Sequence, residues 1–295
     1  MRDDLPEPGS PPDLPVSWVD VFGRGPLSGN PVAVVHDADA LDDATQAAFA
    51  RWANLSETTF LLRPEARGAD YRVRIRTPTE ELPFAGHPTL GTAHAWLAAG
   101  GKPARDGVVV QECGVGLVEV RVGPGPEDLA FRAPALLRSG PVDGATLDRA
   151  RASLRLAPEE VLRAAWIDNG PGWLGLQLRD AERVLALEPD VVAMRGLELG
   201  VIGAHTGSEA QRLGAAYEVR AFCPGYAVPE DPVTGSLNAG FAVWLVGEGV
   251  LPESYVARQG TAMGRDGRVR VTTDEAGALW VGGAARTVAV GRVRL

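Results

Sequence analysis

Two long runs without a charged side chain constrain the fold of this chain more than any other feature of its sequence. They cover residues 89–98 and 237–246, have the spacing of helices, and each contains a Trp-Leu pair. A helix that has no polar face is buried on all sides. We therefore expect two internal helices, over 88–99 and 236–246, each enclosed by a sheet that rolls around it.

The two runs belong to a longer internal repeat. The motif PFAGH (83–87) precedes the first predicted helix, PVTGS (232–236) precedes the second, and a predicted strand precedes each motif. Chance similarity of short Pro/Gly loops is the alternative to a duplication, but the period far exceeds the ~20–50 residues of a solenoid repeat. We predict an α+β protein of two similar domains, each a rolled mixed or antiparallel sheet around a central apolar helix.

The domain boundary is placed in the Gly- and Pro-containing segment 139–144. The chain is thus divided into a loose, acidic, proline-rich tail (1–15), an N-terminal domain (16–138) and a C-terminal domain (139–295). The last strand of the chain could still return to the N-terminal domain. Hydrophobic alternation and helix caps predict further elements. These are strands at 16–22, 31–35, 58–62, 71–76, 164–167, 173–178, 201–205, 217–222, 268–273, 279–281 and 287–293, and helices at 42–52 and 189–197.

Charge and hydropathy exclude several classes of function. The 38 acidic and 29 basic residues give a formal charge of -9, which argues against a nucleic acid or an anionic membrane as partner. No apolar run approaches the ~20 residues of a membrane helix, and the first residues lack the apolar core of a signal peptide. The sequence therefore predicts a cytoplasmic protein.

Side chains that cofactor and metal enzymes require are scarce. Lys102 is the only lysine and lies in a turn-like Gly-Gly-Lys-Pro segment, so a Schiff base with pyridoxal phosphate is not expected. The only cysteines, Cys113 and Cys223, exclude a Cys-rich zinc site and lie at non-equivalent points of the repeat, which favours inert thiols. Residues 170–175 match G-x-G-x-x-G, but a strand follows where a dinucleotide motif needs a helix. We expect neither a cofactor nor a metal ion.

Polar side chains gather where each uncharged helix begins. His87 lies at the first start, and Asp231, Thr234 and Ser236 lie at the second. The structural alternatives are N-capping for Ser236 and Thr234, a solvated turn for Asp231 and a core position for His87. Helix N-termini carry partial positive charge, so two of them that met at the domain interface would form an anion site.

Glu57 is the candidate general acid/base. It lies between a predicted helix and an apolar strand, in the motif NLSET (54–58). A carboxylate half-buried at such a junction has a pKa raised toward neutrality, as proton transfer at neutral pH requires. The alternative is a surface glutamate in a capping turn. The nearby Gly29-Asn30-Pro31 is interpreted as a purely structural turn.

Four short motifs occur in a fixed order along the chain. They are GNP at 29–31, NLSET at 54–58, FAGHPTLG at 84–91 and EDPVTGS at 230–236. With these motifs the chain resembles the PhzF-like phenazine biosynthesis family, from about residue 16 to the C-terminus. The resemblance implies a diaminopimelate-epimerase-like fold, in which the active site lies between two similar domains.

The resemblance also implies an activity. The best-understood member of the family is a cofactor-independent isomerase that acts on trans-2,3-dihydro-3-hydroxyanthranilate, and its general acid/base glutamate corresponds to Glu57. The residues that the resemblance assigns to catalysis are Glu57, His87 and Asp231. Those that it assigns to substrate binding are Gly86, Gly235 and Ser236. Related epimerases carry a cysteine in each domain where this chain has the two glycines, so a two-thiol mechanism is not expected.

We therefore expect an isomerase of a small cyclic or amino carboxylic acid that works by general acid/base proton transfer. An amino-acid or hydroxy-acid epimerase and a non-catalytic small-anion binding protein are the alternatives. The expected partner is a small carboxylate, with neither nucleic acid nor membrane, and a homodimer is compatible with the resemblance.

Overall fold

The computed structural model describes residues 13–125, 128–226 and 228–295 and shows an α+β chain rich in strands. The helices are α1 (Asp43–Ala53), α2 (Gly86–Ala98), α3 (Gly144–Ser153), α4 (Ala181–Leu185), α5 (Gly207–Leu213) and α6 (Gly235–Phe241). The strands of the first half are β1 (Asp13–Val21), β2 (Asn30–Val35), β3 (Glu57–Leu62), β4 (Tyr71–Arg76), β5 (Glu81–Leu82), β6 (Val108–Cys113), β7 (Gly116–Val122) and β8 (Leu129–Arg132). Those of the second half are β9 (Arg138–Gly140), β10 (Val161–Asp168), β11 (Trp173–Leu178), β12 (Glu198–Ala204), β13 (Tyr217–Cys223), β14 (Val228–Asp231), β15 (Ser254–Gln259), β16 (Gly267–Thr273), β17 (Leu279–Gly283) and β18 (Ala285–Arg294).

Helix α2 is enclosed by the strands of the first half. It contacts β1, β2, β3, β6 and β8 and also β18 from the end of the chain. Every residue from Gly86 to Ala95 is buried. At Gly91 an added Cβ would lie 2.3 Å from Cγ1 of Val32, so β2 packs directly on the helix backbone. The first uncharged run is therefore a core helix, as predicted.

Helix α6 occupies the same place in the second half. All of its residues are buried, and it contacts β10, β11, β16 and β17. It continues as a π-helical segment over Ala242–Val246, so the predicted helix at 236–246 is confirmed in extent. The structure thus confirms the α+β fold in which rolled strands surround two apolar helices.

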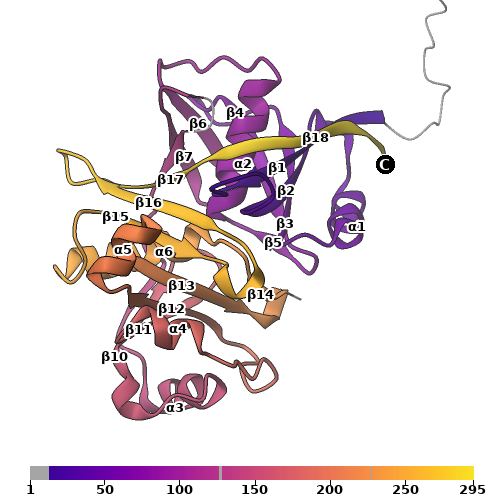
Figure 1. The fold of residues 1–295 in the computed structure, drawn as a ribbon. Coiled ribbons are helices and arrows are strands. Elements are labelled where there is room, and N and C mark those ends of the chain that lie inside the picture. Colours follow the sequence, from indigo (N-terminus) through magenta and orange to yellow (C-terminus); the bar gives the residue numbers. More distant parts are fainter. Residues whose placement is uncertain (1–12, 126–127, 227) are drawn as a thin grey trace, which may run out of the picture.

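Strand pairing joins the two halves into one connected mixed sheet. β17 pairs with β8, and β18 runs back into the first half to pair with β1 (Figure 1). β9 begins at Arg138, one residue before the segment proposed as a linker, and pairs with β10. The division into 16–138 and 139–295 stays a prediction, and the pairings show which strands cross it.

The N-termini of α2 and α6 touch each other. A Cβ added to Gly86 would lie 2.6 Å from the carbonyl carbon of Gly235, and one added to Gly235 would lie 2.9 Å from Cα of Gly86. Real Cβ atoms do not approach backbone so closely, so glycine alone fits at both positions. The two electropositive helix ends therefore meet where the halves join.

One predicted helix is wrong. Residues 191–196 form a run of turns: the Asp190 carboxylate accepts the N–H groups of Val192 and Ala193 at 3.1 and 3.0 Å, as a helix N-cap does, but no helix follows and Gly196 ends the run in the left-handed conformation at φ 75°. The helix of this region is α4 instead. It begins after Asp180, whose carboxylate caps the backbone N–H of Arg183 at 2.8 Å.

The predicted tail is also too long. Residues 13–15 belong to β1, where Asp13 pairs with Arg294 and the Pro15 carbonyl accepts the His36 N–H at 2.9 Å. The rest of the predicted tail, 1–12, lies outside the described residues.

Replacing Gly86 by Ala should lower the free energy of unfolding by about 1–3 kcal/mol, because the new methyl group overlaps the backbone of α6. Urea unfolding measures this. Gly144→Ala is the matched control, since Gly144 also begins a helix but has open space at its Cβ position. Equal stabilities of the two variants would contradict the tight contact between the helix ends.

Candidate active site

Glu57 lies between the end of α1 and the start of β3, and the C-cap of α1 sets the direction in which the chain enters this strand. Asn54 caps this helix in the left-handed conformation, φ 51°, and turns the chain into β3. β3 runs parallel to β2, with Glu57 opposite Val32. Glu57 is thus the first residue of a buried strand, and its Oε2 lies 3.4 Å from Nδ1 of His87 at the start of α2.

The Glu57 carboxyl is buried without a cation beside it. Its side chain is 14% exposed, and Oε2 has no hydrogen-bond partner within the described part of the chain. Burial, followed by the negative charge of Asp231, raises the pKa of Glu57 well above its usual value of 4.5. A pKa raised in this direction suits a general acid/base, which has to take up and release a proton at the working pH.

His87 is the second residue of α2 and is 2% exposed. Besides Glu57, its Nδ1 has Nδ2 of Asn30 as a neighbour at 3.2 Å. Burial lowers the pKa of His87 to about 3, against the effect of a backbone hydrogen bond with Pro31. The imidazole is therefore neutral at neutral pH.

Asp231, the last residue of β14, is held by three donors. Its Oδ1 accepts the Ser56 hydroxyl at 2.7 Å and Nδ2 of Asn30 at 2.8 Å, and its Oδ2 accepts the Thr234 hydroxyl at 2.5 Å. Burial raises the pKa of Asp231, while these three bonds oppose the rise. Hydrogen bonds to the charged form fix this carboxylate in one orientation as an acceptor.

Ser236 lies in the first turn of α6 and accepts hydrogen bonds from two side chains. One belongs to Trp173, the first residue of β11, and the other to Asn169, which precedes that strand. Nε1 of Trp173 donates to its Oγ at 3.1 Å, and Nδ2 of Asn169 donates to its carbonyl at 2.8 Å. Because Oγ accepts from the indole, the hydroxyl proton of Ser236 points elsewhere. It is available to donate to a ligand at the helix ends.

These groups enclose a small cavity between the halves. Its volume is about 20 Å³, and Glu57, Asp231, Ser236, Trp173 and Cys223 are among its lining residues. This is room for about one water molecule. Burial keeps the pKa of the Cys223 thiol well above its usual value of 9, so the thiol stays protonated, in line with the inert role expected of it.

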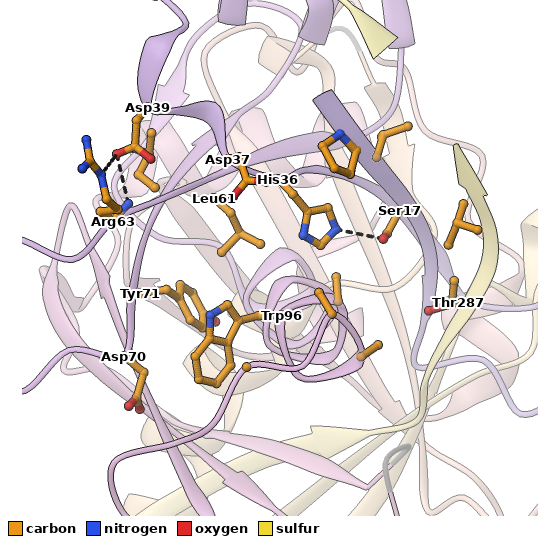
Figure 2. Close-up of a pocket in the computed structure, with 18 of the residues that line it drawn as sticks. Ser17, His36, Asp37, Asp39, Leu61, Arg63, Asp70, Tyr71, Trp96 and Thr287 are labelled. Carbon is orange, nitrogen blue, oxygen red and sulfur yellow. Dashed lines mark hydrogen bonds and ion pairs between the residues drawn. The ribbon is translucent and has the colours of Figure 1, made fainter. Parts of the chain in front are cut away.

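A much larger cavity lies at the other end of α2, near Trp96 (Figure 2). Its volume is about 680 Å³, and Ser17, His36 and Tyr71 are among its lining residues. Three of its polar side chains have partners: Nε2 of His36 lies 2.9 Å from Oγ of Ser17, and the Tyr71 hydroxyl donates to Gln111, which does not line the cavity. None of the predicted site residues lines it.

The structure brings together every residue that the sequence assigned to the site. Glu57, His87 and Asp231 lie in one network, Gly86 and Gly235 make the contact between the helix ends, and Ser236 lines the cavity.

Three further residues of the site were missed. Asn30 was interpreted as part of a structural turn, Trp173 lay in a rejected glycine motif, and Ser56 had no assignment. Their roles depend on contacts across the halves, and the spacing of residues along the chain carries no signal for such contacts.

Within residues 13–125, 128–226 and 228–295, no group of three His, Cys, Asp or Glu side chains is arranged to hold a metal ion. In the same ranges no helix has both the length and the apolar character needed to cross a membrane. The expected cytoplasmic location and the homodimer stay predictions.

The fold and the site define a class of protein: epimerase-like folds with two similar halves and a buried acid at the meeting point of their central helices. Comparison with known proteins agrees. The Phenazine biosynthesis-like protein family (PhzC-PhzF) matches residues 19–291. A crystal structure of a PhzF-family phenazine biosynthesis protein from Enterococcus faecalis superposes with a TM-score of 0.76 at 25% identity, over 96% of this chain and 100% of that one.

Curated relatives cover nearly the whole chain. Trans-2,3-dihydro-3-hydroxyanthranilate isomerase of Pseudomonas aeruginosa is 34% identical over 94% of this chain and 98% of its own length. A Schizosaccharomyces pombe protein named Antisense-enhancing sequence 1 is 35% identical over 93% of this chain and 96% of its own length. The chain belongs to the phenazine biosynthesis-like family, and the predictions of this family and of an isomerase are confirmed.

Replacing Glu57 by Gln should stabilise the protein at neutral pH. The pKa of Glu57 is raised in the folded state, so the folded state binds more protons than the unfolded state between pH 4.5 and the folded pKa. Stability of the wild type therefore falls as pH rises through this window, and Gln removes the loss.

Urea unfolding of both forms at pH 4 and pH 7 measures the effect. The advantage of Glu57→Gln should be near zero at pH 4 and at least about 1 kcal/mol at pH 7. An advantage that is the same at both pH values would show that the Glu57 carboxyl is not destabilised by burial.

Proposed function

We propose that this enzyme isomerises a small cyclic or amino carboxylic acid without a cofactor, by moving one proton between two carbons of the substrate. The observation that carries this proposal is the buried, unpartnered Glu57 carboxyl next to two touching helix ends. The named activity of the Pseudomonas aeruginosa relative supports trans-2,3-dihydro-3-hydroxyanthranilate as the type of substrate.

The N-termini of α2 and α6 are the proposed binding site of the substrate carboxylate. Neither α2 nor α6 has an acidic residue in its own first turn, so the partial positive charge of both ends faces only the nearby carboxyls of Glu57 and Asp231. The first backbone N–H groups of a helix lack intrahelical partners and bind anions readily. The Ser236 hydroxyl, turned away from Trp173, adds a further donor.

Glu57 is the proposed proton carrier. As a carboxylate it takes a proton from one carbon of a conjugated substrate, and the electron pair of that C–H bond moves into the conjugated system. The same carboxyl group then returns the proton to another carbon, so that a double bond shifts and no atom is gained or lost. Such positioned transfer is worth ~10²–10⁴-fold in rate, and orientation of the substrate must supply the rest.

Asp231 is the proposed holder of an amino or hydroxyl group of the substrate. Three donors already occupy three of the roughly four acceptor positions of its carboxylate, which leaves one for a substrate donor and favours an accepting and orienting role over proton abstraction. An epimerase needs a second base on the opposite face of the carbon, and the fixed Asp231 is poorly suited to that work. The isomerase is therefore preferred to the epimerase.

Glu57→Gln should reduce the incorporation of solvent deuterium into trans-2,3-dihydro-3-hydroxyanthranilate by at least about 100-fold, because the amide cannot carry the proton. Mass spectrometry of the product formed in D₂O measures this. Glu218→Gln is the matched control: Glu218 is fully buried with a pKa raised to about 7 by burial, but it does not line the cavity.

Incorporation by Glu57→Gln at the wild-type rate would remove Glu57 from the mechanism. A wild-type protein that binds the acid but exchanges no proton would instead favour the small-anion binding protein. Following the configuration of the product separates an isomerase from an epimerase.

Ser236→Ala should weaken the binding of the same acid about 10- to 100-fold, since a hydrogen bond to a charged group is worth about 1.5–3 kcal/mol. Calorimetric titration in the Glu57→Gln background measures binding without turnover. Trp173→Phe is the companion variant, because it removes the N–H that orients the hydroxyl and keeps the aromatic ring. Unchanged affinity in Ser236→Ala would place the carboxylate elsewhere.

A further inference from the structure

The strands that lead to the two touching helix ends correspond one to one between the halves. In the first half β2 runs parallel to β3, and β3, β4 and β5 pair antiparallel in turn before α2 begins. In the second half β11 runs parallel to β12, and β12, β13 and β14 pair antiparallel in turn before α6 begins. Each position around one helix end therefore has a counterpart around the other.

The register of these strands makes Glu198 the counterpart of Glu57. In each half we start four residues before the glycine that begins the helix and follow the pairings outward over two strands. The pairs are Leu82–Ile75 and Ile75–Thr59 in the first half and Asp231–Ala221 and Ala221–Gly200 in the second. The residue two positions before the end of this path is Glu57, the first of β3, or Glu198, the first of β12.

Glu198 projects to the side of the sheet on which the small cavity lies. It is in register with Trp173 of β11, which lines this cavity and reaches Ser236. Residues in register on neighbouring strands project from the same face of a sheet. Burial, and then the charges of Asp231 and Glu198, raise the pKa of the Cys223 thiol, which also lines the cavity. Glu198 thus lies beside the cavity, on the side of the second half.

The carboxyl group of Glu198 has one bound oxygen and one free oxygen. It accepts a hydrogen bond from the backbone N–H of Gly225, where an added Cβ would lie 2.4 Å from Oε1 of Glu198. Its Oε2 is buried and has no hydrogen-bond partner within the described residues, and the same is true of Oε2 of Glu57. A buried polar atom without a partner is costly. Both halves therefore present an unsatisfied carboxyl oxygen next to the helix ends.

The surroundings of Glu198 favour its protonated form. Burial raises the pKa of Glu198 to about 8, with help from the negative charge of Glu80 and against the hydrogen bond from Gly225. Glu80 is exposed and lies between β4 and β5, so it belongs to the first half. The neighbouring Cys223 thiol is also protonated. Because Oε1 accepts from the backbone, the proton of Glu198 sits on the unpartnered Oε2 and is free to be donated.

We propose that Glu198 contacts the substrate and donates its carboxyl proton in a hydrogen bond to an oxygen substituent of the acid. This inference rests on the proposed function, because it takes the substrate carboxylate to lie at the helix ends. Asp231 can only accept from the substrate, whereas Glu198 donates to it, so the two acids recognise different groups. The ligand class that fits is a carboxylic acid that carries both a hydrogen-bond donor and a hydroxyl or keto oxygen.

The pH dependence of binding tests this inference. Trans-2,3-dihydro-3-hydroxyanthranilate is titrated calorimetrically into Glu57→Gln protein between pH 6.5 and pH 9.5. Its affinity should fall at least about 10-fold above pH 8, because Glu198 then loses the proton that it donates. When Glu198→Gln is added, the amide keeps a donor at every pH and this fall should disappear. Titration of the acid itself is common to both proteins and cancels in the comparison.

Two further variants separate this role from a structural one. Glu218→Gln is the matched control, because Glu218 is a buried glutamate of the neighbouring β13 whose oxygens have His205 and Thr261 as partners. It should leave the fall in affinity in place. Glu80→Gln removes only an exposed charge, which should move the midpoint of the fall to lower pH, since this charge helps to raise the pKa of Glu198.

An equal loss of affinity at high pH with and without Glu198→Gln would overturn the inference and leave the proposed function intact. If Glu198→Gln does not fold, an unmoved midpoint in Glu80→Gln would overturn it instead. Absence of binding in every form and at every pH would contradict the proposed substrate and this inference with it. Because no turnover is needed, the deuterium experiment on Glu57 stays an independent test.

Discussion

The contact between Gly86 and Gly235 is the constraint on which the rest of the molecule depends. Two helix ends of the same polarity repel each other, yet here no side chain separates them. The apolar side chains of the one connected sheet hold them together, since strands of the first half surround α2 and strands of the second half surround α6. Burial of the two uncharged helices therefore stabilises the electropositive spot that an anionic substrate would neutralise.

The polar side chains around the two helix ends come from both halves of the chain, and each half supplies a different kind of group. The first half supplies Glu57 and the neutral His87, and the second supplies the fixed Asp231 and Ser236. Asn30 crosses the junction and ties the two sets together. Glu57 is the one acidic group of this set that lacks a compensating donor, and this difference from Asp231 is what separates a proton carrier from an orienting acceptor.

Much of the fold was predictable because hydrophobic patterning is local. Three features could be predicted from neighbouring residues alone. They are the two uncharged helices, the strand with alternating burial at Tyr71–Arg76 and the Asp cap before α1. The predicted helix at 189–197 is wrong because only a run of turns forms at 191–196, although Asp190 provides an N-cap and Gly196 a C-terminal stop. The site residues were found through their motifs, whereas Asn30 and Trp173 act only through partners far away in the chain.

The size of the cavity adds a requirement for function. At about 20 Å³ it is far smaller than any cyclic carboxylic acid, so a substrate must part the helix ends or the loops around them to enter. The halves are joined by the pairings of β17 with β8 and of β18 with β1, which lie along strands rather than at the site. One apolar cluster runs through both halves and contains residues of α2 and α6, so an opening of the junction has to leave this shared core in place. The desolvation that raises the pKa of Glu57 therefore depends on the two helix ends staying together, as they do in this structure.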